Sequence, residues 1–168
     1  MKFKNYITAF FIIGILGTLS HFVYEWSGEV KLLGLIFPVN ESVWEHLKLL
    51  FFPTLVYSFF EYRHLKEKPQ NYLFSLAISV FSGMVSIVTL FYTISGVIGK
   101  RIDFINILIY FVGIIVMLIN KNKILKSGNF SSNKAFWFAL ILLSLTAVLF
   151  VTFSFNPLKL GIFAPPEK

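Results

Sequence analysis

Long apolar stretches alternate with short polar segments along the whole chain. Five such stretches are present: Tyr6–Trp26, Ser42–Tyr62, Asn71–Ile98, Asp103–Asn120 and Ala135–Phe155. A helix that rises about 1.5 Å per residue needs about 20 apolar residues to cross a hydrocarbon layer about 30 Å thick. The pattern therefore predicts an all-α fold, in which residues 1–168 form a single integral membrane bundle of about five transmembrane helices.

The connection between the first two stretches, Gly28–Asn40, has the sequence GEVKLLGLIFPVN. It is too apolar for an ordinary water-exposed loop and too short to cross a bilayer. We expect it to lie in the membrane interface or to dip into the bundle as a re-entrant segment.

Composition supports a lipid environment. Hydrophobic residues make up 57% of the chain and charged residues 14%, whereas soluble domains contain about 25% charged residues. The net charge of +7 does not indicate nucleic-acid binding, because the basic residues punctuate the apolar stretches and form no single water-facing patch. The chain has no cysteine, which excludes disulfides and thiolate metal ligands. The expected partner is the lipid bilayer.

The distribution of Lys and Arg predicts the orientation. With the N-terminus in the cytoplasm, nine of the fifteen basic residues fall on the inner side and six on the other. Cytoplasmic segments of membrane proteins are enriched in basic residues. We therefore expect a multi-pass protein of the cell membrane with its N-terminus cytoplasmic and its C-terminus outside.

Ionisable residues are concentrated where the first predicted helix ends and the second begins. The chain has eight acidic residues and three histidines, and six of these eleven lie within 26 residues: His21, Glu25, Glu29, Glu41, Glu45 and His46. Helical rise places His21 and His46 at similar depth in two antiparallel helices. An ionisable residue inside a membrane span usually marks function.

These residues predict an outward-facing pocket for a cation or a small polar ligand. Its predicted lining is His21, Glu25, Asn40, Glu41, Glu45 and His46. Imidazole and carboxylate together suit a divalent metal such as zinc, and the predicted metal ligands are His21, Glu45 and His46. Neighbouring residues of a helix are rotated by about 100°, so Glu45 and His46 would not both bind one metal in ideal geometry.

Local structure offers another explanation for some of these side chains. Ser42 and Glu45 have the spacing of a capping box, and Asn40 is a competing N-cap. Glu45 and Lys48 are spaced for an intrahelical ion pair. Gly14, Gly17, His21 and Glu25 share one stripe of the first helix, and small residues on such a stripe indicate close packing against another helix.

Three functions fit the pattern. The first is binding of a cation or polar ligand, as in a transporter or a metal-binding protein. The second is hydrolysis at the membrane surface, assisted by a metal or by acid and base catalysis, with Glu45 or Glu41 as the base. The third is a non-catalytic membrane subunit or scaffold in which hydrogen bonds lock the first two helices together. Its partner would be a second copy of the chain or another membrane subunit.

Two segments carry a resemblance to a known family. They are GTLSHFVYEWSG at residues 17–28 and VNESVWEHLKLLFFP at residues 39–53. Together they resemble a family of small bacterial polytopic membrane proteins of unknown function. Over the rest of the chain the likeness lies in the succession of hydrophobic spans. The resemblance implies a polytopic membrane fold and no particular activity.

Overall fold

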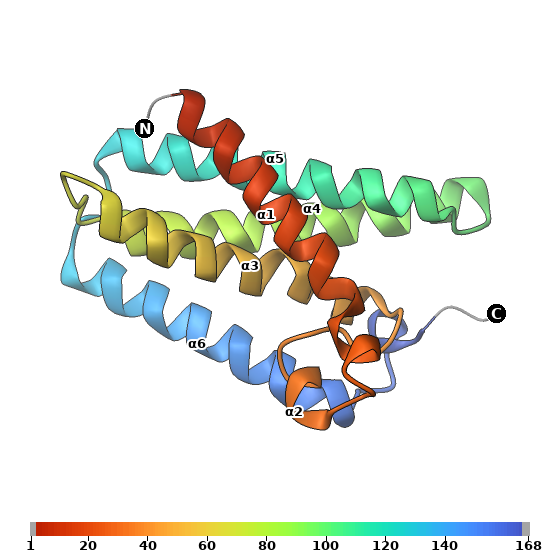
Figure 1. Ribbon diagram of the computed structural model, residues 1–168. Coiled ribbons are helices and arrows are strands. Elements are labelled where there is room, and N and C mark those ends of the chain that lie inside the picture. Colours follow the sequence, from red (N-terminus) through yellow and green to blue (C-terminus); the bar gives the residue numbers. More distant parts are fainter. Residues whose placement is uncertain (1–2, 166–168) are drawn as a thin grey trace.

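The computed structural model describes residues 3–165, and this part of the chain is entirely helical, without β-strands. Its elements are α1 (Phe3–Trp26), α2 (Lys31–Gly34), α3 (Val43–His64), α4 (Tyr72–Ile98), α5 (Asp103–Ser127), α6 (Asn133–Phe155) and the 3-10 helix η1 (Gly161–Phe163). The five long helices form one bundle (Figure 1), in which α4 packs against α3, α5 and α6, and α1 packs against α3 and α5. The predicted all-α fold is confirmed.

Four helices are long and apolar enough to cross a membrane. They are the Tyr6–Trp26 part of α1 and the helices α4, α5 and α6. Their outer surfaces carry large apolar side chains, such as Phe11, Phe104 and Ile141, each more than half exposed. Water would not stabilise so much exposed apolar surface, whereas lipid chains do. The chain is therefore a multi-pass membrane protein.

The second predicted span differs from the other four. It forms the 22-residue helix α3, but α3 is not among the helices apolar enough to cross a membrane by composition. Glu45, Lys48 and Glu61 lower its apolar character. The structure shows why they are tolerated: Glu45 is paired with Lys48 and Glu61 with Lys121 inside the bundle. The five-span count stays a prediction.

The connection between α1 and α3 folds over one end of the bundle, which we call the α2 end (Figure 1). It contains the single turn α2, and it buries Gly34 and Pro38 while Leu32 remains exposed. Its placement in the interface or as a re-entrant segment stays a prediction.

The small-residue stripe of α1 packs against neighbouring helices as predicted. A Cβ atom at Gly17 would overlap the Tyr110 hydroxyl of α5 and the Leu49 carbonyl oxygen of α3. The Tyr110 hydroxyl occupies the space beside Gly17, where it donates to the carbonyl oxygens of Ile13 at 3.1 Å and Leu49 at 3.3 Å. Glycine at position 17 thus lets three helices meet at one point.

We expect Gly17→Ala to destabilise the bundle by about 1–3 kcal/mol, because the added methyl group must push α1 away from α3 and α5. Gly96→Ala is the matched control: Gly96 is also helical, and its Cβ would meet nothing within 4 Å. At this open position alanine is expected to add up to about 1 kcal/mol of stability through helix propensity. Thermal unfolding in detergent measures both. Equal melting temperatures would show that α1 does not depend on close packing at Gly17.

Candidate metal centre

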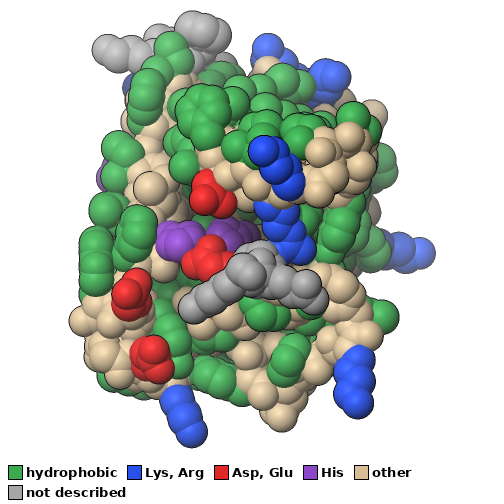
Figure 2. All heavy atoms as spheres, turned by 90° about the vertical axis from the view of Figure 1, so that its right-hand side faces the viewer, with side chains coloured by type: hydrophobic (Ala, Val, Ile, Leu, Met, Phe, Trp, Pro, Cys, Tyr) green, Lys and Arg blue, Asp and Glu red, His purple; other side chains and the backbone are tan. Residues whose placement is uncertain are grey.

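Histidine and acidic side chains gather on the α2 end of the molecule (Figure 2). The start of α3 fixes this region locally. The Ser42 hydroxyl accepts from the backbone N–H of Glu45 at 3.3 Å, which confirms Ser42 as the N-cap. The Asn40 side-chain oxygen accepts from the N–H of Ser42 at 2.9 Å. These two bonds hold the backbone on both sides of Glu41.

The His46 ring is oriented by its own helix. Its Nδ1 lies 2.8 Å from the Ser42 carbonyl oxygen, so Nδ1 must carry the hydrogen and donate. In the neutral ring this leaves a lone pair on Nε2. A hydrogen bond from the other ring nitrogen to a backbone carbonyl is the usual support of a histidine that binds a metal.

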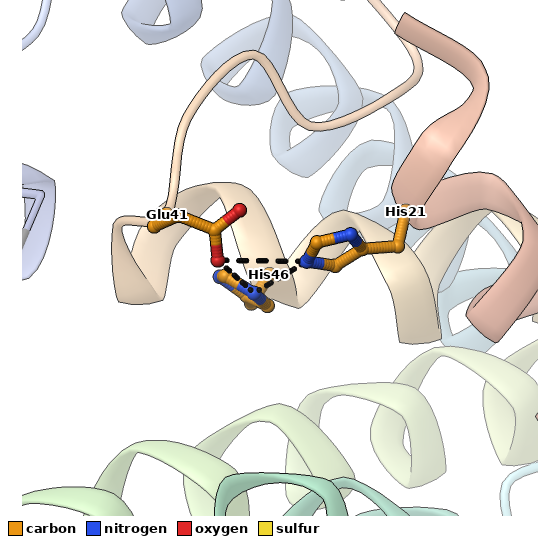
Figure 3. Close-up of side chains that lie close together, drawn as sticks. All are labelled: His21, Glu41 and His46. Atoms are coloured by element: carbon orange, nitrogen blue, oxygen red, sulfur yellow. Dashed lines mark hydrogen bonds and ion pairs between the residues drawn. The ribbon is translucent and has the colours of Figure 1, made fainter. Parts of the chain in front are cut away.

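Three side chains, from two helices and the connection between them, converge at one point (Figure 3). His21 comes from the second half of α1, Glu41 from the residues just before α3, and His46 from the first turns of α3. The Nε2 atoms of the two histidines are 3.2 Å apart. The Glu41 Oε2 atom lies 3.5 Å from Nε2 of His21 and 3.3 Å from Nε2 of His46.

This triangle has the dimensions of a tetrahedral metal site. With ligands about 2.0–2.1 Å from zinc, neighbouring ligand atoms of a tetrahedron are about 3.3–3.4 Å apart. The three observed edges of 3.2, 3.3 and 3.5 Å match that spacing. A single ion on one side of the triangle would reach all three atoms and leave one tetrahedral position open.

Protons alone do not satisfy the triangle. A hydrogen bond between the two histidines uses the one hydrogen that lies between their Nε2 atoms. The accepting ring then turns its lone pair toward the lone pairs of Glu41. If both rings instead donate to Glu41, each Nε2 atom carries a hydrogen. The 3.2 Å contact between the two Nε2 atoms then brings two donors together. At least one of the three short edges is therefore unfavourable, whereas a cation inside the triangle attracts all three atoms.

The site is reachable from outside and carries negative charge. The side chains of His21 and His46 are 28% and 32% exposed, and that of Glu41 is 60% exposed. When His46 is protonated, its hydrogen bond to Glu41 holds the pKa of that carboxyl below its usual value, and the charges of both protonated histidines act in the same direction. Glu41 is thus a carboxylate at neutral pH and available as a metal ligand.

The structure separates the other predicted site residues from this group. Glu45 was the predicted carboxylate ligand, but its side chain is 2% exposed, accepts from Lys48 Nζ at 2.7 Å and accepts from the Val39 N–H at 2.9 Å. Rotation along α3 turns Glu45 away from His46, so Glu41 takes the place beside the histidines. Glu25 is exposed one turn beyond His21, and its side chain has no hydrogen bond or ion pair within residues 3–165. Asn40 supports the turn.

Lys48 organises the α2 end, and sequence reasoning considered it only as a helical ion-pair partner. Its fully enclosed ammonium donates to the carbonyl oxygens of Gly34 at 2.8 Å and Phe37 at 3.3 Å, to Glu45 and to the Ser154 hydroxyl at 2.6 Å. It therefore ties the connection and α6 to α3. The sequence does contain one indication of this role: Lys48 stands between apolar residues, where a lysine must find partners inside the protein.

A second buried polar group at the other end of α3 was missed. The side chains of Glu61 and Lys121 are 7% and 2% exposed, and their charged atoms are 2.6 Å apart. The Tyr72 hydroxyl donates to Glu61 as well. Lys121 is buried because α5 continues to Ser127, seven residues beyond the predicted end at Asn120. In this longer helix the Lys121 side chain reaches Glu61 of α3.

The fold and the site define a multi-pass helical membrane protein with a His–Glu–His group at one end of its bundle. The chain belongs to the family of unknown function DUF6512, whose model matches residues 1–166. This agrees with the resemblance seen in the sequence. No curated protein and no solved structure matches the chain.

Lys48→Met should lower the free energy of unfolding by about 3–5 kcal/mol, because it leaves the buried Glu45 carboxylate without its cation. Lys31→Met removes an exposed lysine of α2 and should have little effect. Combining Lys48→Met with Glu45→Gln removes both charges and should recover part of the loss. Thermal unfolding in detergent compares the variants. Equal melting temperatures for Lys48→Met and Lys31→Met would contradict the role of Lys48.

Proposed function

We propose that this membrane protein binds a divalent transition-metal ion of the zinc type through His21, Glu41 and His46. The observation that carries the proposal is the triangle of Nε2, Oε2 and Nε2 atoms with edges of 3.2–3.5 Å. The Nδ1–H bond of His46 supports it, because in the neutral ring this bond leaves the Nε2 lone pair for a cation.

The ligand types favour zinc over calcium or magnesium. Calcium takes six to eight oxygen ligands and magnesium keeps an octahedral shell of oxygens, whereas two imidazoles and one carboxylate are typical of zinc and related metals. Nickel and copper bind the same ligand types, so their affinities are part of the test. The chain has no cysteine that could complete a thiolate site.

Metal-assisted hydrolysis is a second candidate, favoured by the number of ligands. Catalytic zinc sites have three protein ligands and an open position for water or substrate, and three ligands converge here. Glu45, one of the two predicted bases, is enclosed and bonded to Lys48, so a substrate does not reach it. Glu41 would serve as a ligand. The base in such a reaction would have to come from another group, and metal binding without hydrolysis is the simpler proposal.

The scaffold hypothesis explains the same contacts as a polar lock between α1 and α3. It predicts that His21 and His46 contribute to stability whether or not metal is added. Metal binding predicts that zinc itself raises stability, by about 2.7 kcal/mol when free zinc is 100 times the Kd. Transport of the cation through the bundle stays a prediction.

Isothermal titration of the detergent-purified protein with zinc should show one site per chain. His21→Ala and His46→Ala should each weaken zinc binding by at least about 100-fold, since loss of a supporting group alone costs about 10–100-fold. Glu41→Gln keeps the shape of the side chain but removes its charge, and should also weaken binding strongly. Zinc should raise the melting temperature of the wild type but not of these variants.

The chain offers a closely matched control in His64. Like His46 it belongs to α3 and has its Nδ1 close to the carbonyl oxygen four residues earlier, here Phe60 at 2.7 Å, but it lies at the opposite end of the helix. His64→Ala should leave zinc binding unchanged. If His64→Ala weakens binding as much as His46→Ala does, the zinc is bound without the triangle, and the proposal fails.

Zinc affinity should fall as the solution becomes acidic, because protonated imidazoles cannot bind a metal. Glu41 should not contribute to this fall, because its lowered pKa keeps it ionised until the solution is more acidic. Titrations at pH 7.5, 6.5 and 5.5 test this order. Affinity that is constant over this range would show that the histidines are not ligands.

A further inference from the structure

A cavity lies far from the histidines. Its volume is about 560 Å³, and it lies between α3, α4 and α6 near the α3–α4 and α5–α6 connections, which we call the loop end. Ser58 and Tyr62, in the last two turns of α3, line it, whereas His46 is in the first turns of that helix. Cavities of 300–1,000 Å³ are typical of sites for small organic ligands.

The wall of this cavity changes from apolar to polar toward the loop end. Leucine and phenylalanine side chains of the three helices form its apolar wall: Leu55, Phe59, Leu73, Leu76, Phe136 and Leu143. Its rim carries Lys68, Gln70, Ser131 and Asn133. Phe59 and Phe136 are about half exposed on the outer surface of the bundle. An occupant that matches this wall has an apolar tail and a polar head.

The apolar part points along the helices toward a second cavity. This cavity, of about 290 Å³, lies between the same three helices and is lined mainly by apolar residues, among them Leu47, Phe81 and Leu149. Leu76 of the first cavity and Phe81 of the second are five residues apart on α4, hence about 7.5 Å along the axis. A hydrocarbon chain that enters from the loop end is therefore directed into a further apolar groove.

The charge of the rim favours an anionic head. Lys68 is the only charged residue among those lining the cavity, and its ammonium lies 5.3 Å from the centre of the Tyr62 ring, which belongs to the same wall. Within residues 3–165 the side chains of Lys68, Gln70 and Asn133 make no hydrogen bond, so their donors are available to a ligand. The nearest buried carboxylate, Glu61, is already neutralised by Lys121.

We infer that this cavity is a binding site for one anionic phospholipid of the surrounding bilayer. Lys68, Gln70 and Asn133 would bind the phosphate-bearing head, and an acyl chain would lie along the leucine and phenylalanine wall. The floor of the cavity includes Ser58 and Tyr72, both hydrogen-bonded within the Glu61–Lys121 group. The lipid thus keeps water away from this buried ion pair, which joins α3 to α5.

Native mass spectrometry of the full chain in detergent, titrated with phosphatidylglycerol or phosphatidylcholine, tests the inference. The wild type should retain one phosphatidylglycerol per chain in clear preference to phosphatidylcholine. Lys68→Gln should weaken phosphatidylglycerol binding by about fivefold, the effect of one lysine near an anionic head. Lys66→Gln removes a neighbouring exposed lysine that does not line the cavity, and should leave binding unchanged.

Leu73→Trp fills the cavity and should abolish retention of the lipid, and cooperative thermal unfolding in detergent reports whether this variant is folded. Three results would overturn the inference: equal losses for Lys68→Gln and Lys66→Gln, equal retention of the two lipids by the wild type, and stabilisation by inorganic phosphate equal to that by phosphatidylglycerol. A second copy of the chain in place of the lipid would be seen as a dimer that Leu73→Trp disrupts, and would overturn it too.

Discussion

The ammonium of Lys48 is enclosed in the protein, and the arrangement of the α2 end depends on how it is neutralised. One carboxylate, two backbone carbonyls and one hydroxyl surround it. A charge in this position would be very costly without such partners, because neither lipid nor apolar side chains solvate it. Its partners come from α3, from the connection that contains α2 and from α6, so meeting this one requirement fixes three segments relative to one another. Glu45 extends the same group to the backbone of Val39, two residues before Glu41.

The candidate metal centre follows from that arrangement. Glu41 reaches the histidines because the connection is held by Lys48 and Glu45 on one side and by the Ser42 cap on the other. His21 reaches them because Gly17, one turn earlier on the same stripe, lets α1 approach α3 closely. The two acidic residues at the start of α3 therefore have different roles. Glu45 supports the fold by neutralising a buried cation, and Glu41, more than half exposed, remains available to a ligand.

The bundle has a polar group at each end of α3, and the two differ in chemistry. At the loop end, Glu61 and Lys121 are paired with each other and bonded to Tyr72 and Ser58. This group already contains opposite charges and attracts no further ion. At the α2 end, two imidazoles and a carboxylate converge at one point, and the group includes no lysine or arginine. This difference in composition is the reason for proposing a metal at the α2 end and a lipid, outside the ion pair, at the loop end.

The sequence alone determined the helical membrane character, because runs of about 20 apolar residues have only one stable structure in a bilayer. It also determined which region holds the candidate chemistry, since so few ionisable residues are present and six of them lie between His21 and His46. Helical spacing correctly predicted the Gly17 packing stripe and gave Ser42 as one of two candidate caps, because both features depend on neighbours within a few residues. Only the tertiary structure decided between Glu41 and Glu45 beside the histidines. That choice depends on the path of a 16-residue connection between helices, which is held by Lys48 through contacts as distant as Ser154. The burial of the Glu61–Lys121 pair was likewise beyond the sequence, because it requires the length of α5 and its packing against α3, and neither is encoded in the local pattern around either residue.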